Sequence, residues 1–275
     1  MKIFKFFKFK FPKWSLPSLP RFFSSSFSFY GAWKKFTKQV PTDSRSILKN
    51  YQHFIVVGLK ESGKTELIEG LIEQSQDLYP FDTVYKTHPE IQFYLGPQQV
   101  IQEIAFSSLE DRSIKLRKQI IRLWKKLYAK HDPVVVITYP LFFDASSDVK
   151  ELNKYAQLVG GKISLLTELR KNPIKVRIAL THMDKISGYL EFARFLKQQN
   201  LEFRLFLSSD FESGTLTAQV KKFSEEIHSL LLTTVSSRDY VKICEFFKQL
   251  PLYFISLEEF LRNLVNRVSF RDSVI

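Results

Sequence analysis

One stretch of eight residues, 58–65, constrains the fold of this chain more than any other. It fits the pattern G-x-x-x-x-G-K-[ST], which is typical of a phosphate-binding P-loop (Walker A). The apolar run at residues 54–57 predicts a buried strand before the loop, and residues 65–72 predict an amphipathic helix after it. A strand, a glycine turn and a helix in this order predict an α/β fold in which backbone N–H groups and a helix N-terminus face a phosphate.

The residues of this loop take separate roles in the nucleotide-binding interpretation. The Lys64 ammonium would reach the β- and γ-phosphates, and the Thr65 hydroxyl would ligate Mg²⁺. The expected binding residues are Gly58, Leu59, Lys60, Glu61, Ser62, Gly63, Lys64 and Thr65. The alternative is an ordinary glycine-containing turn between a strand and a helix, which needs no ligand.

Composition narrows the class of protein. The apolar fraction of 44% and the charged fraction of 25% are typical of a globular chain. The single cysteine, Cys244, excludes an internal disulfide and is typical of a reducing compartment. No uninterrupted apolar run is long enough to predict a membrane-spanning helix.

Residues 1–42 form a basic and aromatic segment. They hold eight Lys, one Arg, ten Phe and two Trp but no acidic residue, so most of the formal charge of +13 belongs to them. Lysines interleaved with aromatic rings are typical of the interface of an anionic bilayer, which predicts peripheral attachment to a membrane. The alternatives are a disordered basic arm for a protein or nucleic acid, and an import presequence. The nearly balanced charge of the remaining chain argues against nucleic acid.

Strand and helix patterns alternate from residue 51 onward, which predicts a doubly wound, mostly parallel α/β sheet of the P-loop NTPase type. The expected strands are 54–57, 91–94, 100–106, 133–139, 176–180 and 203–207, of which the second and third form a hairpin. The expected helices are 65–72, 111–130, 148–170, 190–198 and 218–232, the third of them interrupted at Gly160 and Gly161. The helix at 111–130 is basic and amphipathic, with Leu116, Ile120, Leu123, Trp124 and Leu127 on its apolar face.

Two short motifs follow the last expected strands. Thr181, His182 and Asp184 resemble the guanine-reading [NT]-K-x-D motif of P-loop GTPases, with His182 in the Lys position. As a buried carboxylate, Asp184 would accept hydrogen bonds from guanine groups that adenine lacks. The resemblance implies that Thr181 braces the P-loop and that His182 stacks on the base. Ser208 and Ser209 resemble the [SC]-A-x motif, whose N–H groups contact the guanine O6. Taken alone, these motifs also fit a helix N-cap and a turn.

A D-x-x-G motif is missing after the strand expected at 100–106. In GTPases this motif supports Mg²⁺, senses the γ-phosphate and positions water. Glu103, Glu110 and Asp111 are candidates to replace its Mg²⁺ carboxylate, and Thr83 and Thr87 are candidates for the switch-one threonine. We therefore expect nucleotide binding to be better preserved than hydrolysis.

The order of these motifs resembles a divergent small-GTPase domain, and more specifically the GTPase-like domain of the IcmF/TssM family, inner-membrane subunits of type IV and type VI secretion systems. The likeness spans about residues 50–270. It includes the segment 173–184, and residues 250–254 followed by an amphipathic helix. The family's subunits are far longer, with transmembrane helices and a large periplasmic region. A second similar family is the β subunit of the signal-recognition-particle receptor, whose tether is a spanning helix.

The resemblance implies that the chain binds GTP or GDP with Mg²⁺ and has protein partners in a membrane complex. We expect three parts: a tail at 1–47 that is disordered or membrane-interfacial, a GTPase-like domain at 48–235, and a helical extension at 236–275. The extension carries an apolar stripe that packs on its own domain or on a partner: Phe246, Phe247, Leu250, Phe254, Leu257, Phe260, Leu261 and Leu264.

The expected function is guanine-nucleotide binding at the cytoplasmic face of a membrane, with slow or degenerate GTPase activity that regulates or assembles a complex. The catalytic residues are not identified by the sequence. Two alternatives stay open. One is a non-hydrolysing P-loop scaffold that acts as an interaction module, and the other is an ATP-using P-loop enzyme.

Overall fold

The computed structural model describes residues 28–40, 42–45, 47–76, 84–85, 90–96, 99–105, 114–128, 132–141, 149–170, 174–206 and 212–266. Its strands are β1 (Gln52–Gly58), β2 (Val84–Tyr85), β3 (Ile91–Gly96), β4 (Gln99–Ile104), β5 (Val134–Pro140) and β6 (Lys175–Thr181). Its α-helices are α1 (Phe29–Gln39), α2 (Thr42–Arg45), α3 (Lys64–Gln76), α5 (Ile114–Leu127), α6 (Val149–Arg170), α7 (Tyr189–Gln199), α8 (Thr215–Thr234) and α9 (Ser237–Val265). Two short 3₁₀ helices are η1 (Ile47–Asn50) and η2 (Met183–Lys185).

The six strands form one sheet in the order β2-β3-β4-β1-β5-β6. Strands β4, β1, β5 and β6 run parallel, while β3 pairs antiparallel with both β4 and β2. The register places Val56 of β1 beside Glu103 of β4, and Gly58 of β1 beside Thr138 of β5. The expected hairpin and the mostly parallel sheet are therefore confirmed.

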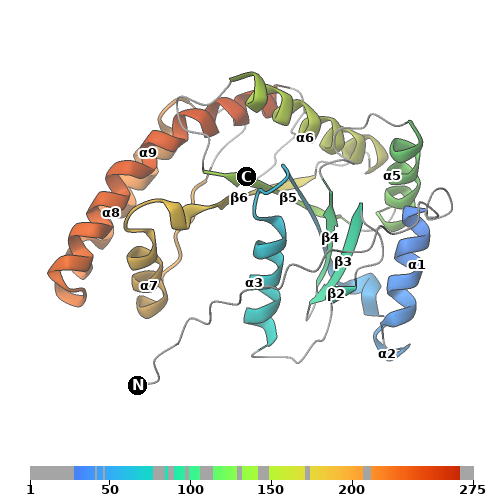
Figure 1. Cartoon of the computed structure of the whole chain (residues 1–275), viewed down its shortest axis with the longest axis horizontal. Coiled ribbons are helices and arrows are strands. Elements are labelled where there is room, and N and C mark those ends of the chain that lie inside the picture. Colours follow the sequence, from blue (N-terminus) through green and yellow to red (C-terminus); the bar gives the residue numbers. More distant parts are fainter. Residues whose placement is uncertain are drawn as a thin grey trace, which may run out of the picture.

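Helices cover both faces of this sheet, as expected for a doubly wound fold. Ile68 of α3 packs with Val56, Tyr94 and Ile101 in a small cluster on one face. The alternate residues of the same strands, such as Ile55 and Val57, belong to the large core under α1, α5, α6 and α9. In Figure 1, α1 and α5 lie at one end of the sheet, and α7, α8 and α9 lie at the other.

Helix α1 lies within the segment expected to be a tail. Phe29, Ala32, Phe36 and Val40 are fully buried, and the ring of Phe36 lies 5.4 Å from that of Phe93 on β3. Phe29 and Phe36 of this segment therefore belong to the core of the domain, and residues 29–39 form an ordered helix. The lysines obscured this pattern, because they occupy the opposite face of the same helix.

Helix α9 packs on its own domain. The ring of Phe260 stacks on Tyr155 of α6 at 4.9 Å, and the ring of Phe246 stacks on Phe192 of α7 at 5.0 Å. The stripe expected in the extension is buried, with Phe247 partly so. Pro251 lies inside this helix and does not precede it, contrary to the expected segment order. A proline inside a helix costs about 3 kcal/mol, and several buried side chains worth roughly 1.5–3 kcal/mol each outweigh it.

Two further expectations are wrong. Helix α6 continues through Gly160 and Gly161, since burial of Val159 and Ile163 on either side outweighs the cost of about 1 kcal/mol per glycine. Residues 203–206 form no strand. The side-chain amide of Gln219 instead accepts from the Phe206 N–H at 2.7 Å and donates to its carbonyl oxygen at 2.5 Å, replacing the bonds of a neighbouring strand.

Among the described residues, no helix combines the length and apolar character that crossing a bilayer requires.

Candidate functional site

The P-loop connects β1 to α3 at the edge of the sheet where the parallel strands end. Strand β1 ends at Gly58, and α3 begins at Lys64. The end of β6 lies at the same edge, so that Thr181 and His182 are brought to the loop although the sequence separates them from it by more than a hundred residues. This edge is where open α/β sheets bind their ligands.

Lys64 is folded into its own loop. Its ammonium donates to the carbonyl oxygens of Gly58 at 3.2 Å and Leu59 at 2.5 Å, and lies 3.5 Å from the Ser62 hydroxyl. The residue is only 8% exposed. Burial lowers the pKa of Lys64, and the carboxylates of Glu103 and Glu66 oppose that shift. A phosphate would favour the charged form in the same way, since an anion near an ammonium stabilises its proton.

Thr65 contacts a carboxylate of the neighbouring strand. Its hydroxyl donates to Glu103 Oε1 at 3.0 Å, and the Tyr94 hydroxyl donates to Glu103 Oε2 at 2.6 Å. Burial and the bond to Glu103 raise the pKa of Tyr94, which keeps this phenol a donor. A hydroxyl and a carboxylate are hard oxygen ligands, and Mg²⁺ is commonly held by one such carboxylate together with substrate phosphates. Thr65 and Glu103 therefore fit a Mg²⁺ ion, which would neutralise phosphate charge there.

Two adjacent residues at the end of β6 hold the loop from the other side. The Thr181 hydroxyl donates to the Ser62 carbonyl oxygen at 2.8 Å, which is the bracing contact that the GTPase resemblance implies. The His182 Nε2–H donates to the Glu61 carbonyl oxygen at 2.9 Å. Both His182 (φ 59°) and Glu61 (φ 60°) adopt the left-handed conformation, which is uncommon without glycine and tends to cluster at functional sites.

Two residues that the sequence did not single out complete the loop's support. Thr138 of β5 lies with its hydroxyl 2.6 Å from that of Ser62. Tyr155 of α6 donates to the Thr138 carbonyl oxygen at 2.6 Å and receives a bond from the Leu59 N–H. The signal for Thr138 was present, because it is a buried polar residue inside an otherwise apolar strand and such groups need partners. Tyr155 had no such signal.

Asp184 lies in η2, directly after the two bracing residues. Its side chain is exposed. The 3₁₀ helix η2 places the residue just beyond the end of β6, close to the start of α7. Burial, and secondarily the Asp184 charge, raise the pKa of nearby Tyr189. The other predicted site residues, Ser208, Ser209, Thr83, Thr87, Glu110 and Asp111, lie outside the described residues.

We expect Glu103→Gln to weaken Mg²⁺ binding to the nucleotide complex by about 10- to 100-fold, because an amide is a weaker ligand and hydrogen-bond partner for this ion. The measurement is a titration with GTP across a range of Mg²⁺ concentrations. Glu66→Gln is the matched control, since it removes the other carboxylate that acts on Lys64 and is exposed. Equal Mg²⁺ dependence in both variants would exclude Glu103 from the metal site.

Comparisons with known proteins leave the family open. No protein-family model matches this chain, and no curated protein matches it.

Three solved structures are similar in part. One is a small COPII coat GTPase SAR1 from Encephalitozoon cuniculi in complex with GDP, at 13% identity and a TM-score of 0.34 over 82% of this chain and 90% of that chain. Another is the periplasmic domain of a lipopolysaccharide acetyltransferase from Salmonella ser. Paratyphi A, at 14% identity and 0.28 over 73% and 75%. The third is the cytosolic domain of the FeoB iron transporter from T. maritima in apo form, at 14% identity and 0.27 over 78% and 96%. Since every TM-score is below 0.5, none of these likenesses bears on function, which rests on the site's own residues.

Proposed function

We propose that this protein binds guanine nucleotides with Mg²⁺ at the cytoplasmic face of a membrane and serves the assembly or regulation of a membrane complex, as the resemblance to IcmF/TssM subunits implies. The observation that carries the nucleotide part is the pair of bonds from Thr181 and His182 to the carbonyl oxygens of Ser62 and Glu61. These bonds tie the base-reading motif to the phosphate-reading loop in a single unit.

In this proposal, separate residues bind the phosphate end and the base end of the nucleotide. Lys64 and the loop's N–H groups bind phosphate, and Thr65 with Glu103 holds Mg²⁺. Asp184 selects guanine, and the resemblance of Ser208 and Ser209 to the [SC]-A-x motif implies that N–H groups there contact the guanine O6. Hydrolysis is slow in this proposal, because no D-x-x-G follows β4 to position water.

Membrane attachment is the second part of the proposal. It rests on the Lys and Phe pattern of residues 1–42, of which helix α1 accounts for the last portion. Because α1 belongs to the core, the membrane-facing residues are the preceding ones and the exposed lysines of α1 itself.

We expect Asp184→Ala to weaken GTP and GDP binding by about 10- to 100-fold and to leave ATP binding unchanged, since it removes the charged acceptor of two hydrogen bonds to guanine. The measurement is a titration of the full-length protein with fluorescent GDP, GTP and ATP in Mg²⁺. Glu225→Ala is the control, because it deletes a carboxylate on α8 that is exposed as Asp184 is. Wild-type protein that prefers ATP would discard the guanine assignment and favour an ATP-using enzyme.

One observation supports the scaffold alternative. The bonds from Lys64 to Gly58 and Leu59 satisfy the ammonium within its own loop, so the loop is held together without a phosphate. A protein that binds none of the three nucleotides would fit this alternative, and its protein partners would then be the next target.

A further inference from the structure

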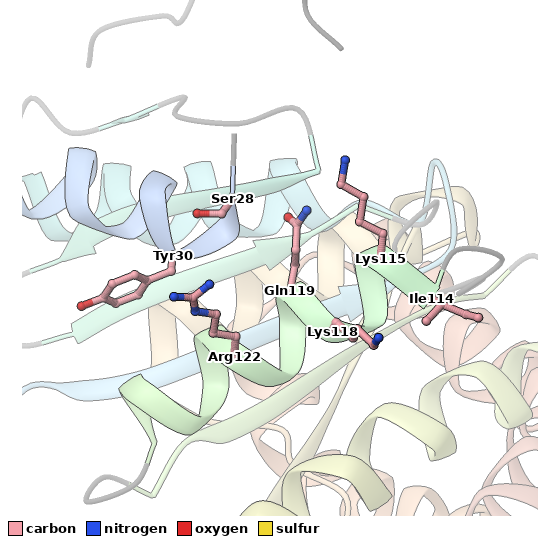
Figure 2. Close-up of a pocket in the computed structure, with 7 residues that line it drawn as sticks. All are labelled: Ser28, Tyr30, Ile114, Lys115, Lys118, Gln119 and Arg122. Atoms are coloured by element: carbon pink, nitrogen blue, oxygen red, sulfur yellow. The ribbon is translucent and has the colours of Figure 1, made fainter. Parts of the chain in front are cut away.

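A hollow lies between the start of α1 and the first turns of α5, on residues that the nucleotide site does not use. Its volume is about 420 Å³. Ser28 and Tyr30 line it from one side, and Lys115, Lys118, Gln119 and Arg122 from the other. Figure 2 shows Ser28 and Tyr30 at the start of α1 beside the labelled side chains of α5.

The two walls of the hollow are fixed. The Phe29 N–H donates to Gln119 Oε1 at 3.3 Å, which ties the first residue of α1 to the middle of α5. The Ser28 hydroxyl caps α1 by accepting from the Gly31 N–H at 3.1 Å. Helix α5 is anchored on its other side by the fully buried rings and aliphatic chains of Trp124, Leu123 and Ile120. The charged face of α5 is therefore held in one orientation.

The charged side chains that line this hollow are all basic. Lys115, Lys118 and Arg122 are exposed, follow one stripe of the helix at spacings of three and four residues, and make no ion pair with any described residue. Lys126 lies 4.1 Å above the Tyr30 ring, which adds another cation beside the hollow. Among the described helices of 11 residues or more, α1 and α5 alone carry no acidic residue.

Three features favour a lipid surface as the occupant. Cations spread over two helices, with six on α5, match a broad array of phosphates better than a single small anion. Ile114 at the start of α5 is 75% exposed beside these cations, and an aliphatic side chain next to lysines is typical of a bilayer interface. Ser28 is preceded in the sequence by the Lys- and Phe-rich segment 1–27, so both stretches would meet the same surface.

We propose that the face formed by α1 and the exposed side of α5 docks on anionic phospholipid, with a headgroup phosphate in the hollow between Tyr30, Lys118 and Arg122. This inference rests on the proposed membrane association and adds that the folded domain itself contacts the lipid. Docking through two rigid helices fixes the orientation of the domain, which attachment through residues 1–27 alone does not.

The test is flotation of the full-length protein with vesicles of phosphatidylcholine, with and without about a third of phosphatidylserine. We expect Lys118→Glu/Arg122→Glu to reduce binding to the anionic vesicles at least tenfold, because two attractive charges become repulsive. Arg194→Glu/Lys197→Glu is the matched control, with the same charge change on exposed residues of α7. A milder variant, Lys118→Ala/Arg122→Ala, keeps the test valid if the reversal unfolds the protein, and thermal melting shows whether each variant is folded.

The outcomes separate this inference from the proposed function. Selective loss in the α5 variants, with the α7 control at wild-type level, supports docking through α1 and α5. Equal flotation of all variants overturns it and leaves membrane attachment to residues 1–27. Wild-type protein that does not float, or that binds an oligonucleotide instead of vesicles, overturns both the docking face and the proposed membrane association.

Discussion

Lys64→Ala will reduce GTP and GDP binding by at least a hundredfold. The ammonium reaches the site through a side chain that is already buried in the P-loop, so it meets a phosphate without the loss of side-chain freedom that an exposed lysine would suffer. Charge-assisted hydrogen bonds contribute about 1.5–3 kcal/mol each. The loss of two of them exceeds the roughly 2.7 kcal/mol that a hundredfold change requires.

The matched control is Lys60→Ala in the same loop. Lys60 carries the same charge but its side chain is 82% exposed, and it pairs with the equally exposed Glu61. Fluorescence titration with labelled GDP measures both variants, and thermal melting shows whether Lys64→Ala remains folded without the bonds to Gly58 and Leu59. Equal, small losses in the two variants would mean that the loop does not bind phosphate through Lys64.

Gly188→Ala will lower the free energy of unfolding by about 2–6 kcal/mol. Gly188 precedes α7 with φ at +82°, where an L-residue is strained by about 1–3 kcal/mol. A Cβ built there would lie 1.9 Å from the Lys242 carbonyl oxygen and 3.2 Å from the Phe246 Cβ, both on α9. That oxygen belongs to the backbone of a packed helix, so relief requires α7 and α9 to separate, and such overpacking costs about 1–3 kcal/mol more.

Gly214→Ala is the matched control, because it has the backbone strain without the contact with α9. Gly214 precedes α8 with a similar φ of +84°, but a Cβ there would meet no atom within 4 Å. Only the backbone strain applies there. In a urea titration, the free energy of unfolding should therefore fall clearly less in Gly214→Ala than in Gly188→Ala. Equal destabilisation would show that contact with α9 contributes nothing at Gly188.

The parts of the fold that were predictable from sequence are those set by local periodicity. The P-loop with its flanking strand and helix, the β3–β4 hairpin, β5 and β6 all carry apolar runs or glycine signals within a few residues. The wrong predictions concern segments whose conformation depends on contacts with residues far away in the sequence. Gln219 supplies the hydrogen bonds that residues 203–206 would find in a sheet, and Phe93 gives the aromatic residues of α1 a core to enter.

The same division applies to the site. Lys64 and Thr65 were predictable because the P-loop motif consists of residues that are neighbours in the sequence. Glu103 was only one of three candidates for the Mg²⁺ carboxylate. The contact of Thr65 with Glu103 needed the register of β1 and β4, which places strands side by side regardless of their separation along the chain. Thr138 and Tyr155 reach the loop in the same way, across a sheet and from a helix beyond it.

Helices α1 and α9 stand at opposite ends of the described chain, yet their buried residues belong to one continuous core. Shortening the protein at residue 48 or 235, where its sequence divides most naturally, would remove α1 or α9 and uncover Phe93 at one end or Tyr155 and Phe192 at the other. Exposed aromatic faces of this kind favour aggregation. We therefore expect the described part of the chain to unfold in a single thermal transition. Fragments that lack α1 or α9 would aggregate before their ligand binding could be measured.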